Sequence, residues 1–95
     1  MRNKIKYVFR IHAVRRMFQR GIDEKEVKDI LENGETIEEY PDDTPFPSRL
    51  VLGWSARGPL HVVVADNQKY GERIVVTVYE PSPDQWDNEF KRRKQ

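Results

Sequence analysis

The sequence contains no cysteine, so the chain can form no disulfide bond and offers no thiolate as a nucleophile or zinc ligand. Only two histidines are present, and they lack the HExxH spacing of zinc peptidases. The five glycines stand apart from one another, which excludes a glycine-rich loop for nucleotide phosphates, and no serine lies in a GxSxG motif. We therefore expect neither a metal nor another cofactor.

Long apolar runs are missing as well, and no stretch of the chain is apolar enough to span a membrane. The basic N-terminal sequence MRNKIKYVFRIH is interrupted by Arg10 and precedes no small-residue cleavage site, so it does not have the pattern of a signal peptide. Together with the absence of cysteine, these features predict a cytoplasmic protein that does not enter the membrane.

A chain of 95 residues has room for one domain, which we place over residues 1–95 with a frayed basic tail at residues 91–95. The net charge is only +1, but residues 1–20 hold seven Lys or Arg and no acid, whereas residues 32–43 hold six Asp or Glu and no base. This asymmetry predicts a phosphate-binding face and a separate face for a basic partner, although a mixed, solvated surface explains the same composition.

Residues 11–20 show the period of an amphipathic helix. One half of the helical wheel carries Ile11, Ala13, Val14, Met17 and Phe18, and the other half carries His12, Arg15, Arg16, Gln19 and Arg20. Gly21 ends this helix, and the sequence IDEKEVKDILENG predicts a second one. Asp23 and Glu26 have the spacing of a capping box, and Gly34 stands where a left-handed C-cap is expected.

After Gly34 the hydrophobic period becomes that of strands. ETIEEY predicts an edge strand, and the proline-rich PDDTPFPS predicts a loop. Three further strands, joined by short turns into an antiparallel sheet, are expected at RLVLGWSA, PLHVVVA and RIVVTVYE. SPDQWDNEFKRRKQ predicts a last helix, with Ser82 as N-cap and Trp86 and Phe90 one turn apart. The expected fold is α+β, with two N-terminal helices, a four-stranded antiparallel sheet and a C-terminal helix.

Strand alternation assigns side chains to the two faces of this sheet. The face expected to contact the helices carries Leu50, Leu52, Trp54, Leu60, Val62, Val64, Ile74, Val76 and Val78. The other face carries Val51, Gly53, Ser55, His61, Val63, Val75, Thr77 and Tyr79. A pairing of Asp66 with Glu72 sets the register of the last hairpin. Antiparallel counting then places His61 opposite Thr77 and diagonal to Tyr79.

The chain carries, in this order, the motifs HAVRRMFQRGI, ENGETIEEYPDD, RLVLGW, PLHVVVA and VVTVYEP. This combination closely resembles the bacterial family known as domain of unknown function 4258, over roughly residues 9–90. Proteins of this kind are similar to RelE-type and BrnT-type toxins, which set helices against a four-stranded antiparallel sheet and cleave RNA without a metal. The resemblance therefore implies a RelE-like fold and a ribonuclease activity.

Metal-independent RNA cleavage requires a base for the 2′-hydroxyl proton, an acid for the leaving 5′-oxygen and cations for the charge that develops on the phosphate. Histidine suits both proton-transfer roles near neutral pH, and arginine can bind a phosphate through two hydrogen bonds. The candidate catalytic residues are His12, His61 and Tyr79, and the candidate substrate-binding residues are Arg16, Arg20 and Thr77. Arg16 and Arg20 follow His12 at i+4 and i+8, so all three share one face of the first helix.

Each candidate also has an ordinary structural explanation. His12 can complete the first turn of its helix, the arginines can be surface cations, and His61 can make a structural hydrogen bond in its apolar strand. A further alternative is that His61 and Arg16 form a buried structural network, with the ligand unknown. The net charge of +1 is also small for a protein that binds RNA.

The sequence leaves two functions open. The first is a metal-independent ribonuclease, the toxin of a toxin–antitoxin pair, whose partners are RNA, free or on the ribosome, and an antitoxin protein. The second is a non-catalytic domain that binds RNA or a protein, with the edge strand ETIEEY recruiting a strand of the partner.

Overall fold

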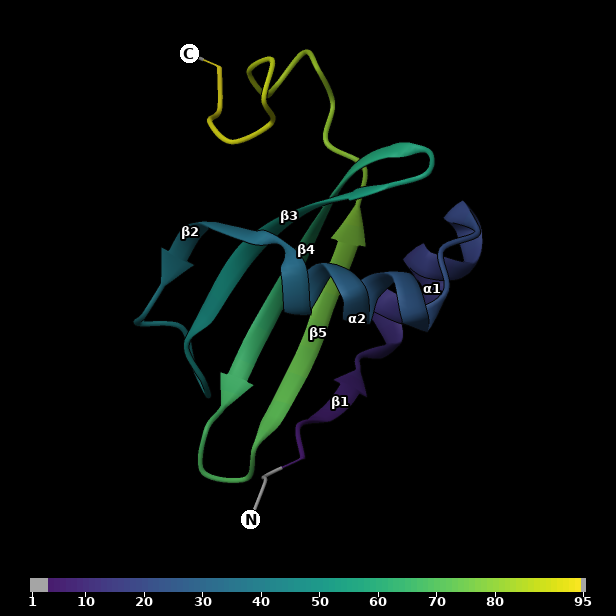
Figure 1. Ribbon diagram of the computed structural model, residues 1–95. Helices are drawn as coiled ribbons and strands as arrows, with labels where there is room; N and C mark the ends of the chain where they lie inside the picture. The colour runs from purple at the N-terminus through teal and green to yellow at the C-terminus, as the bar shows by residue number, and fades with distance from the viewer. Residues whose placement is uncertain (1–3, 95) are drawn as a thin grey trace.

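The computed structural model describes residues 4–94, which form a five-stranded sheet with two helices on one face (Figure 1). The elements follow one another as β1 (Lys6–Phe9), α1 (Ile11–Arg20), α2 (Glu24–Asn33), β2 (Glu35–Tyr40), β3 (Ser48–Ser55), β4 (Gly58–Asn67) and β5 (Glu72–Tyr79). The strands lie in the order β1-β5-β4-β3-β2, so β2 is an edge strand as predicted. None of the helices described within residues 4–94 is long and apolar enough to cross a membrane.

The predicted four-stranded antiparallel sheet is wrong, because the sheet has five strands and is mixed. β1 pairs in parallel with β5, from Lys6 opposite Glu72 to Phe9 opposite Val75. The remaining neighbours, β2 with β3, β3 with β4 and β4 with β5, are antiparallel. The parallel pair joins segments from opposite ends of the chain with no turn between them, so no local signal in the sequence indicates it.

The predicted C-terminal helix is also wrong. One turn begins, in which the Trp86 N–H donates to the Ser82 carbonyl at 3.0 Å. The Asp87 carboxylate then accepts hydrogen bonds from backbone amides that follow it, including that of Lys91 at 3.1 Å, and these bonds replace helical ones. Residues 82–94, which we call the C-terminal segment, therefore fold into a compact irregular loop (Figure 1, top).

The basic end of this segment contacts β2. Lys91 Nζ lies 3.1 Å from a Glu35 carboxylate oxygen, and Arg93 Nε lies 3.7 Å from a Glu38 carboxylate oxygen. Gln95, the last residue of the tail expected to fray, lies outside the described residues.

Both N-terminal helices form where they are predicted. Gly21 ends α1 with a left-handed φ of 66°, and its N–H donates to carbonyls of the last turn. Asp23 Oδ1 accepts from the Glu26 N–H at 2.8 Å while the Glu26 carboxylate accepts from the Asp23 N–H, which completes the capping box of α2. Gly34 is not left-handed as predicted, since its φ is −80°. Glycine is needed there because a Cβ would lie 2.5 Å from the carbonyl oxygen of Leu52.

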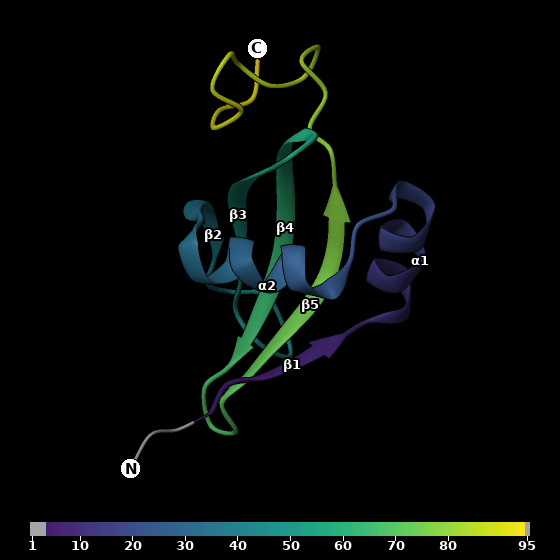
Figure 2. The ribbon, with the colours of Figure 1, turned by 45° about the vertical axis from the view of Figure 1, so that its right-hand side comes forward.

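The two helices share one face of the sheet, with α2 across the middle strands and α1 beside β5 (Figure 2). The helical side of the core consists of Ala13, Met17, Ile22, Val27, Ile30 and Leu31, and the sheet side consists of Val51, Leu60, Val62, Val64, Val75 and Val78. Tyr7 and Phe9 of β1 pack against its margin.

The predicted faces of β3 and of the first half of β5 are wrong. Val51 belongs to the core between the sheet and the helices, and by alternation Gly53 also faces α2. Only glycine fits at position 53, because a Cβ there would lie 2.4 Å from Ile30 Cγ1. Leu50 and Leu52 consequently lie on the other face of the sheet, where both are buried.

The register of the β4–β5 hairpin also differs from the predicted one. Asp66 pairs with Arg73, a shift of one residue. Further along, β5 carries one extra residue, Val76, in a β-bulge. The bulge adds a second shift, so Thr77 and Tyr79 return to their predicted face and His61 lies directly opposite Tyr79 instead of Thr77.

Candidate functional site

The face of the sheet away from the helices contains a hollow of about 480 Å³, which we call the sheet hollow. Its floor and walls include Val63 and Ala65 of β4, Val76 of the bulge, residues 43–46 of the loop before β3, and Arg10 and His12 at the start of α1. The C-terminal segment covers another part of the same face, around His61. One end of this face is therefore closed, and the other is open to a ligand.

α1 carries a row of basic side chains along β5. The helix begins where the Arg10 N–H donates to a carbonyl of β5 at 3.0 Å, and its last turn is joined to the end of β5 by an ion pair of 2.8 Å between Arg20 and Glu80. His12 and Arg16 lie one turn apart between these two points. We call His12, Arg16 and Arg20 the basic row. α1 contains no acidic residue, so nothing within the helix neutralises the row.

The C-terminal end of α1 is held by the turn between β3 and β4. Arg57 Nη1 donates to the Arg20 carbonyl and Arg57 Nη2 donates to the Gly21 carbonyl, each at 2.6 Å. A guanidinium at this end of a helix satisfies carbonyls that lack intrahelical partners and interacts favourably with the helix dipole. The position of the basic row relative to the sheet is therefore fixed at both ends.

His61 is completely buried, and both of its ring nitrogens have partners. Nε2 lies 2.8 Å from the Phe90 carbonyl and Nδ1 lies 3.1 Å from the Tyr79 hydroxyl. A carbonyl can only accept, so Nε2 carries the proton and donates it, while Nδ1 accepts from the hydroxyl of Tyr79. The Trp86 ring packs edge-on at 4.4 Å between centroids. Burial lowers the pKa of His61, although the bond to Phe90 acts in the opposite direction, and the neutral ring is favoured.

Arg93 of the C-terminal segment and Tyr40 of β2 make further contacts beside His61. The Arg93 guanidinium lies 4.6 Å from the Trp86 ring centroid, a cation–π contact. The Tyr40 hydroxyl donates to the Glu38 carboxylate, to which Arg93 also pairs. Burial, followed by the interaction with Glu38, raises the pKa of Tyr40 to about 12. These contacts make the closed end of the face a tightly connected cluster.

The structure brings some of the six predicted site residues into contact and leaves the others apart. His61 and Tyr79 are in contact. Thr77 belongs to the next cross-strand pair on the same face, opposite Val63 in the floor of the sheet hollow. His12 lines the sheet hollow, and the rest of the basic row continues along the same flank of α1. Both histidines thus serve the same side of the sheet, but only His12 is exposed.

Sequence reasoning missed several residues that line the sheet hollow. Arg10 precedes the helix, and its proximity to His12 in the sequence was the available signal. Asp43, Phe46 and Ser48 belong to the proline-rich loop and its junction with β3, and Ser48 Oγ donates to Asp43 at 2.5 Å. The path of this loop over the sheet depends on tertiary contacts, so its residues gave no signal of their own.

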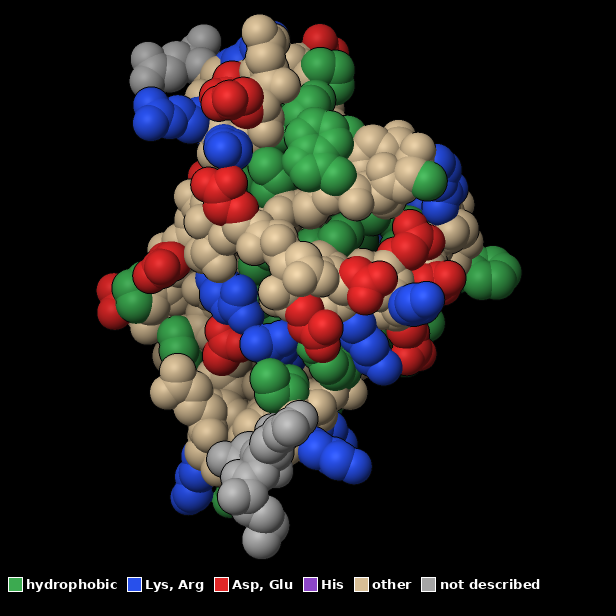
Figure 3. Space-filling model, viewed as in Figure 1, with side chains coloured by type: hydrophobic (Ala, Val, Ile, Leu, Met, Phe, Trp, Pro, Cys, Tyr) green, Lys and Arg blue, Asp and Glu red, His purple; other side chains and the backbone are tan. Residues whose placement is uncertain are grey.

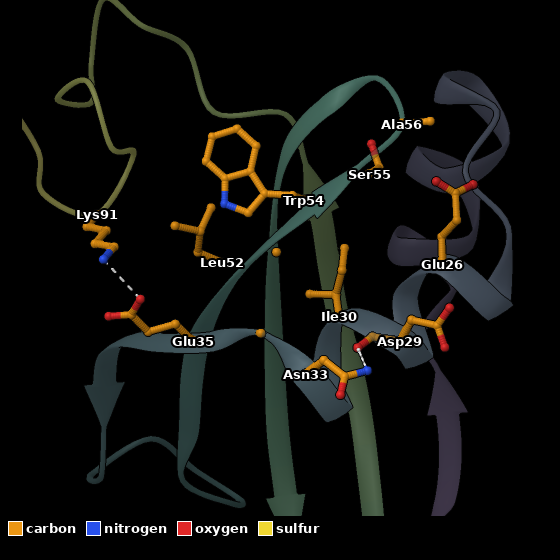
Figure 4. A pocket seen from close by; sticks show the side chains of 12 residues that line it. Glu26, Asp29, Ile30, Asn33, Glu35, Leu52, Trp54, Ser55, Ala56 and Lys91 are labelled. Carbon is orange, nitrogen blue, oxygen red and sulfur yellow. Dashed lines mark hydrogen bonds and ion pairs between the residues drawn. The ribbon is translucent and has the colours of Figure 1, made fainter.

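A second and larger hollow of about 750 Å³ lies between α2, the start of β2 and the C-terminal half of β3 (Figure 4). Glu26, Asp29 and Glu35 surround it, and the one cation among the described residues that line it, Lys91, is paired with Glu35 (Figure 4). The face that carries α2 is a mixture of acidic and basic side chains (Figure 3). An excess of carboxylates repels phosphate, so this hollow is a poorer candidate for an anionic ligand than the smaller one.

Within residues 4–94, no three His, Asp or Glu side chains are arranged so that they could hold a metal ion. The chemistry available at the sheet hollow is that of an exposed imidazole, the Arg10 guanidinium, the Asp43 carboxylate, two hydroxyls and an aromatic ring.

Residues 9–80 match the family described as Domain of unknown function (DUF4258). The match covers well over half of the chain, so the protein belongs to this family. No curated protein and no solved structure matches the chain.

Proposed function

We propose that this protein binds single-stranded RNA in the sheet hollow and along the basic row of α1. The observation that supports this most is the combination of Arg10 and His12 at the wall of an open hollow with a helix that contains no acid. Guanidinium groups bind phosphates through paired hydrogen bonds, and this contact supplies most of the affinity in sequence-independent RNA binding.

The floor and loop of the sheet hollow suit an unpaired base. Val63, Ala65 and Val76 provide an apolar surface, and the half-buried Phe46 offers an aromatic ring on which a base can stack. The Asp43 carboxylate can accept from a base N–H group. Proteins that bind single strands commonly combine such a stacking side chain with a basic groove for the backbone.

A second candidate is metal-independent cleavage of the bound RNA, and the observation that favours it is the exposure of His12 at the hollow. In this reaction His12 takes the proton of a 2′-hydroxyl, and the 2′-oxygen attacks phosphorus. The 5′-oxygen leaves with a proton taken from solvent water, and the product ends in a 2′,3′-cyclic phosphate. Because both nitrogens of His61 are engaged, this scheme gives His61 a positioning role through Tyr79.

The resemblance to RelE-type and BrnT-type toxins supports this second candidate and extends it. In that case the protein is the toxin of a toxin–antitoxin pair that acts in the cytoplasm, and RNA on the ribosome and an antitoxin protein are its partners. The absence of cysteine fits a reducing compartment.

RNA binding is tested by fluorescence anisotropy with a labelled mixed-sequence RNA at several salt concentrations. We expect Arg10→Ala and Arg16→Ala each to weaken binding and to reduce the salt dependence by about one phosphate contact. Arg20→Ala should have a smaller effect, since Glu80 already neutralises Arg20. Lys25→Ala, which removes an exposed cation from α2, is the matched control. Equal losses in Lys25→Ala and Arg16→Ala would rule out the proposed site.

Cleavage is tested with the same RNA, and with ribosome-bound RNA, in excess EDTA. We expect 2′,3′-cyclic phosphate ends with the wild-type protein and none with His12→Ala. Folded His61→Gln should retain part of the activity, because His61 does not touch the RNA in this scheme. If the wild-type protein binds RNA but cuts neither substrate, the protein is a binding domain and the second candidate is rejected.

A further inference from the structure

α1 leaves an apolar stripe uncovered. Ile11 is 70% exposed, Val14 is 47% exposed and Phe18 is 88% exposed, whereas Ala13 and Met17 of the same helix are buried. The sequence places all five apolar residues on one half of the helix, but the sheet covers only the edge that carries Ala13 and Met17. Three large apolar side chains at i, i+3 and i+7 thus form a continuous stripe in solvent, which we call the apolar stripe.

The apolar stripe and the basic row lie on opposite flanks of α1. At about 100° per residue, the centre of the stripe lies roughly 110° from the buried edge in one direction, and the basic row lies on the other side. A ligand on the stripe therefore does not cover His12 or Arg16. Binding at the apolar stripe is thus independent of RNA binding at the basic row.

The charge around the stripe indicates what can cover it. α1 contains three arginines, no acid and a further arginine directly before it. Arg15 lies next to the stripe on the helical wheel, on the side away from the core. If the α1 helices of two copies packed against each other, arginines would face arginines, and like charges disfavour such a pair. The positive potential of these arginines would instead attract an acidic partner.

We propose that the apolar stripe binds an amphipathic helix of a partner protein. The partner's apolar residues at i, i+3, i+4 and i+7 pack on Phe18, Val14 and Ile11, and its flanking carboxylates face Arg15. Phe18 is the anchor, because it is the largest and most exposed side chain of the stripe and buried aromatic side chains supply much of the affinity of an interface. The carboxylates provide specificity and speed the encounter.

The proposal is tested with a fluorescein-labelled designed peptide that forms an amphipathic helix with a leucine stripe and glutamates on its other positions. A peptide with lysine in place of every glutamate is its control. Anisotropy should show binding of the acidic peptide to the wild-type protein and at least about tenfold weaker binding to Phe18→Ser, as expected for loss of an anchor. Tyr70→Ser removes another exposed aromatic side chain, 69% exposed against 88% for Phe18, from the β4–β5 turn and should leave binding unchanged.

Three results would overturn the proposal: binding of neither peptide, equal binding of both peptides, or equal losses in Phe18→Ser and Tyr70→Ser. Sedimentation of the wild-type protein supplies a further test. A dimer that disappears in Phe18→Ser would show that the stripe is covered by a second copy, which also overturns it. Circular dichroism verifies that Phe18→Ser is folded, and unchanged RNA binding by this variant keeps the test separate from the proposed function.

Discussion

His61 and His12 serve the same side of the sheet in contrasting environments. His61 is 0% exposed, its two nitrogens are bonded to Phe90 and Tyr79, and the C-terminal segment lies over it. His12 is exposed and lines a hollow that the C-terminal segment does not reach. The same residue type therefore stabilises one end of this face and is available for a ligand at the other.

The difference shows that the surroundings of a histidine decide its role more than its residue type does. An imidazole whose donor and acceptor are both satisfied in an apolar setting contributes to folding and can be reached only after the C-terminal segment moves. An exposed imidazole beside arginines can approach a phosphate or a 2′-hydroxyl directly. Substitutions at the two ends should consequently affect different measurements.

The largest expected effect is on stability at the closed end. Trp86→Ala removes the ring that packs against His61 and should lower the free energy of unfolding by about 3–4 kcal/mol, as for other buried aromatic residues. Urea denaturation measures this loss. Trp54→Ala is the matched control, because Trp54 is 63% exposed, and should cost less than about 1 kcal/mol. Similar losses in the two variants would contradict the closed arrangement.

The second largest effect is expected in the stability of His61→Ala compared with that of His12→Ala. Loss of the buried ring leaves the Phe90 carbonyl and the Tyr79 hydroxyl without their partner and should lower the free energy of unfolding by about 2–3 kcal/mol. His12→Ala should change it by no more than about 0.5 kcal/mol, as is usual at exposed positions. If the two substitutions are equally tolerated, His61 is not a structural residue.

A smaller effect is expected from pH. Burial lowers the pKa of His61 in the folded protein, so below its ordinary value of 6.5 the unfolded chain binds a proton that the folded protein does not. The contribution to stability is complete above pH 6.5 and is lost as the pH falls through the folded pKa. Backbone hydrogen bonds outweigh the opposing effect of desolvation and lower the pKa of Asp87 below 3.8, so its contribution is lost only at more acidic pH.

Urea midpoints at pH 7.5, 6.5 and 5.5 measure this dependence. His61→Gln keeps a side chain that can hydrogen-bond but does not titrate, so its midpoint should decrease less between pH 6.5 and pH 5.5 than that of the wild-type protein. Identical pH profiles for the two proteins would mean that His61 titrates at its ordinary value in the fold.

The helices could be predicted from the sequence because their signals are local. The capping box of Asp23 and Glu26 and the stop at Gly21 lie within a few residues of the segments that they define. The C-terminal helix was wrong for an equally local reason, since Asp87 competes for backbone amides just after a good N-cap. This competition by Asp87 depends on a loop conformation that helix propensities do not predict.

The sheet could be predicted only in part, because its faces and order depend on tertiary packing. Alternation does not reveal which side of β3 faces α2, and the need for Gly53 under Ile30 decides it. The predicted register was wrong by one residue, and His61 and Tyr79 are neighbours only because the bulge at Val76 shifts the register again. The sheet hollow itself lies between α1 and a loop that are distant in the sequence, so no motif could indicate it.

The measurement that tests RNA binding at the open end most directly is an NMR titration of the two imidazoles with a single-stranded RNA oligonucleotide. Each histidine gives its own ring resonances, and His12→Ala and His61→Gln assign them. We predict that RNA shifts the His12 resonances in a saturable manner and leaves those of His61 unchanged. Saturable shifts of His61 without shifts of His12, or no shift of either while RNA is bound, would contradict the proposed site.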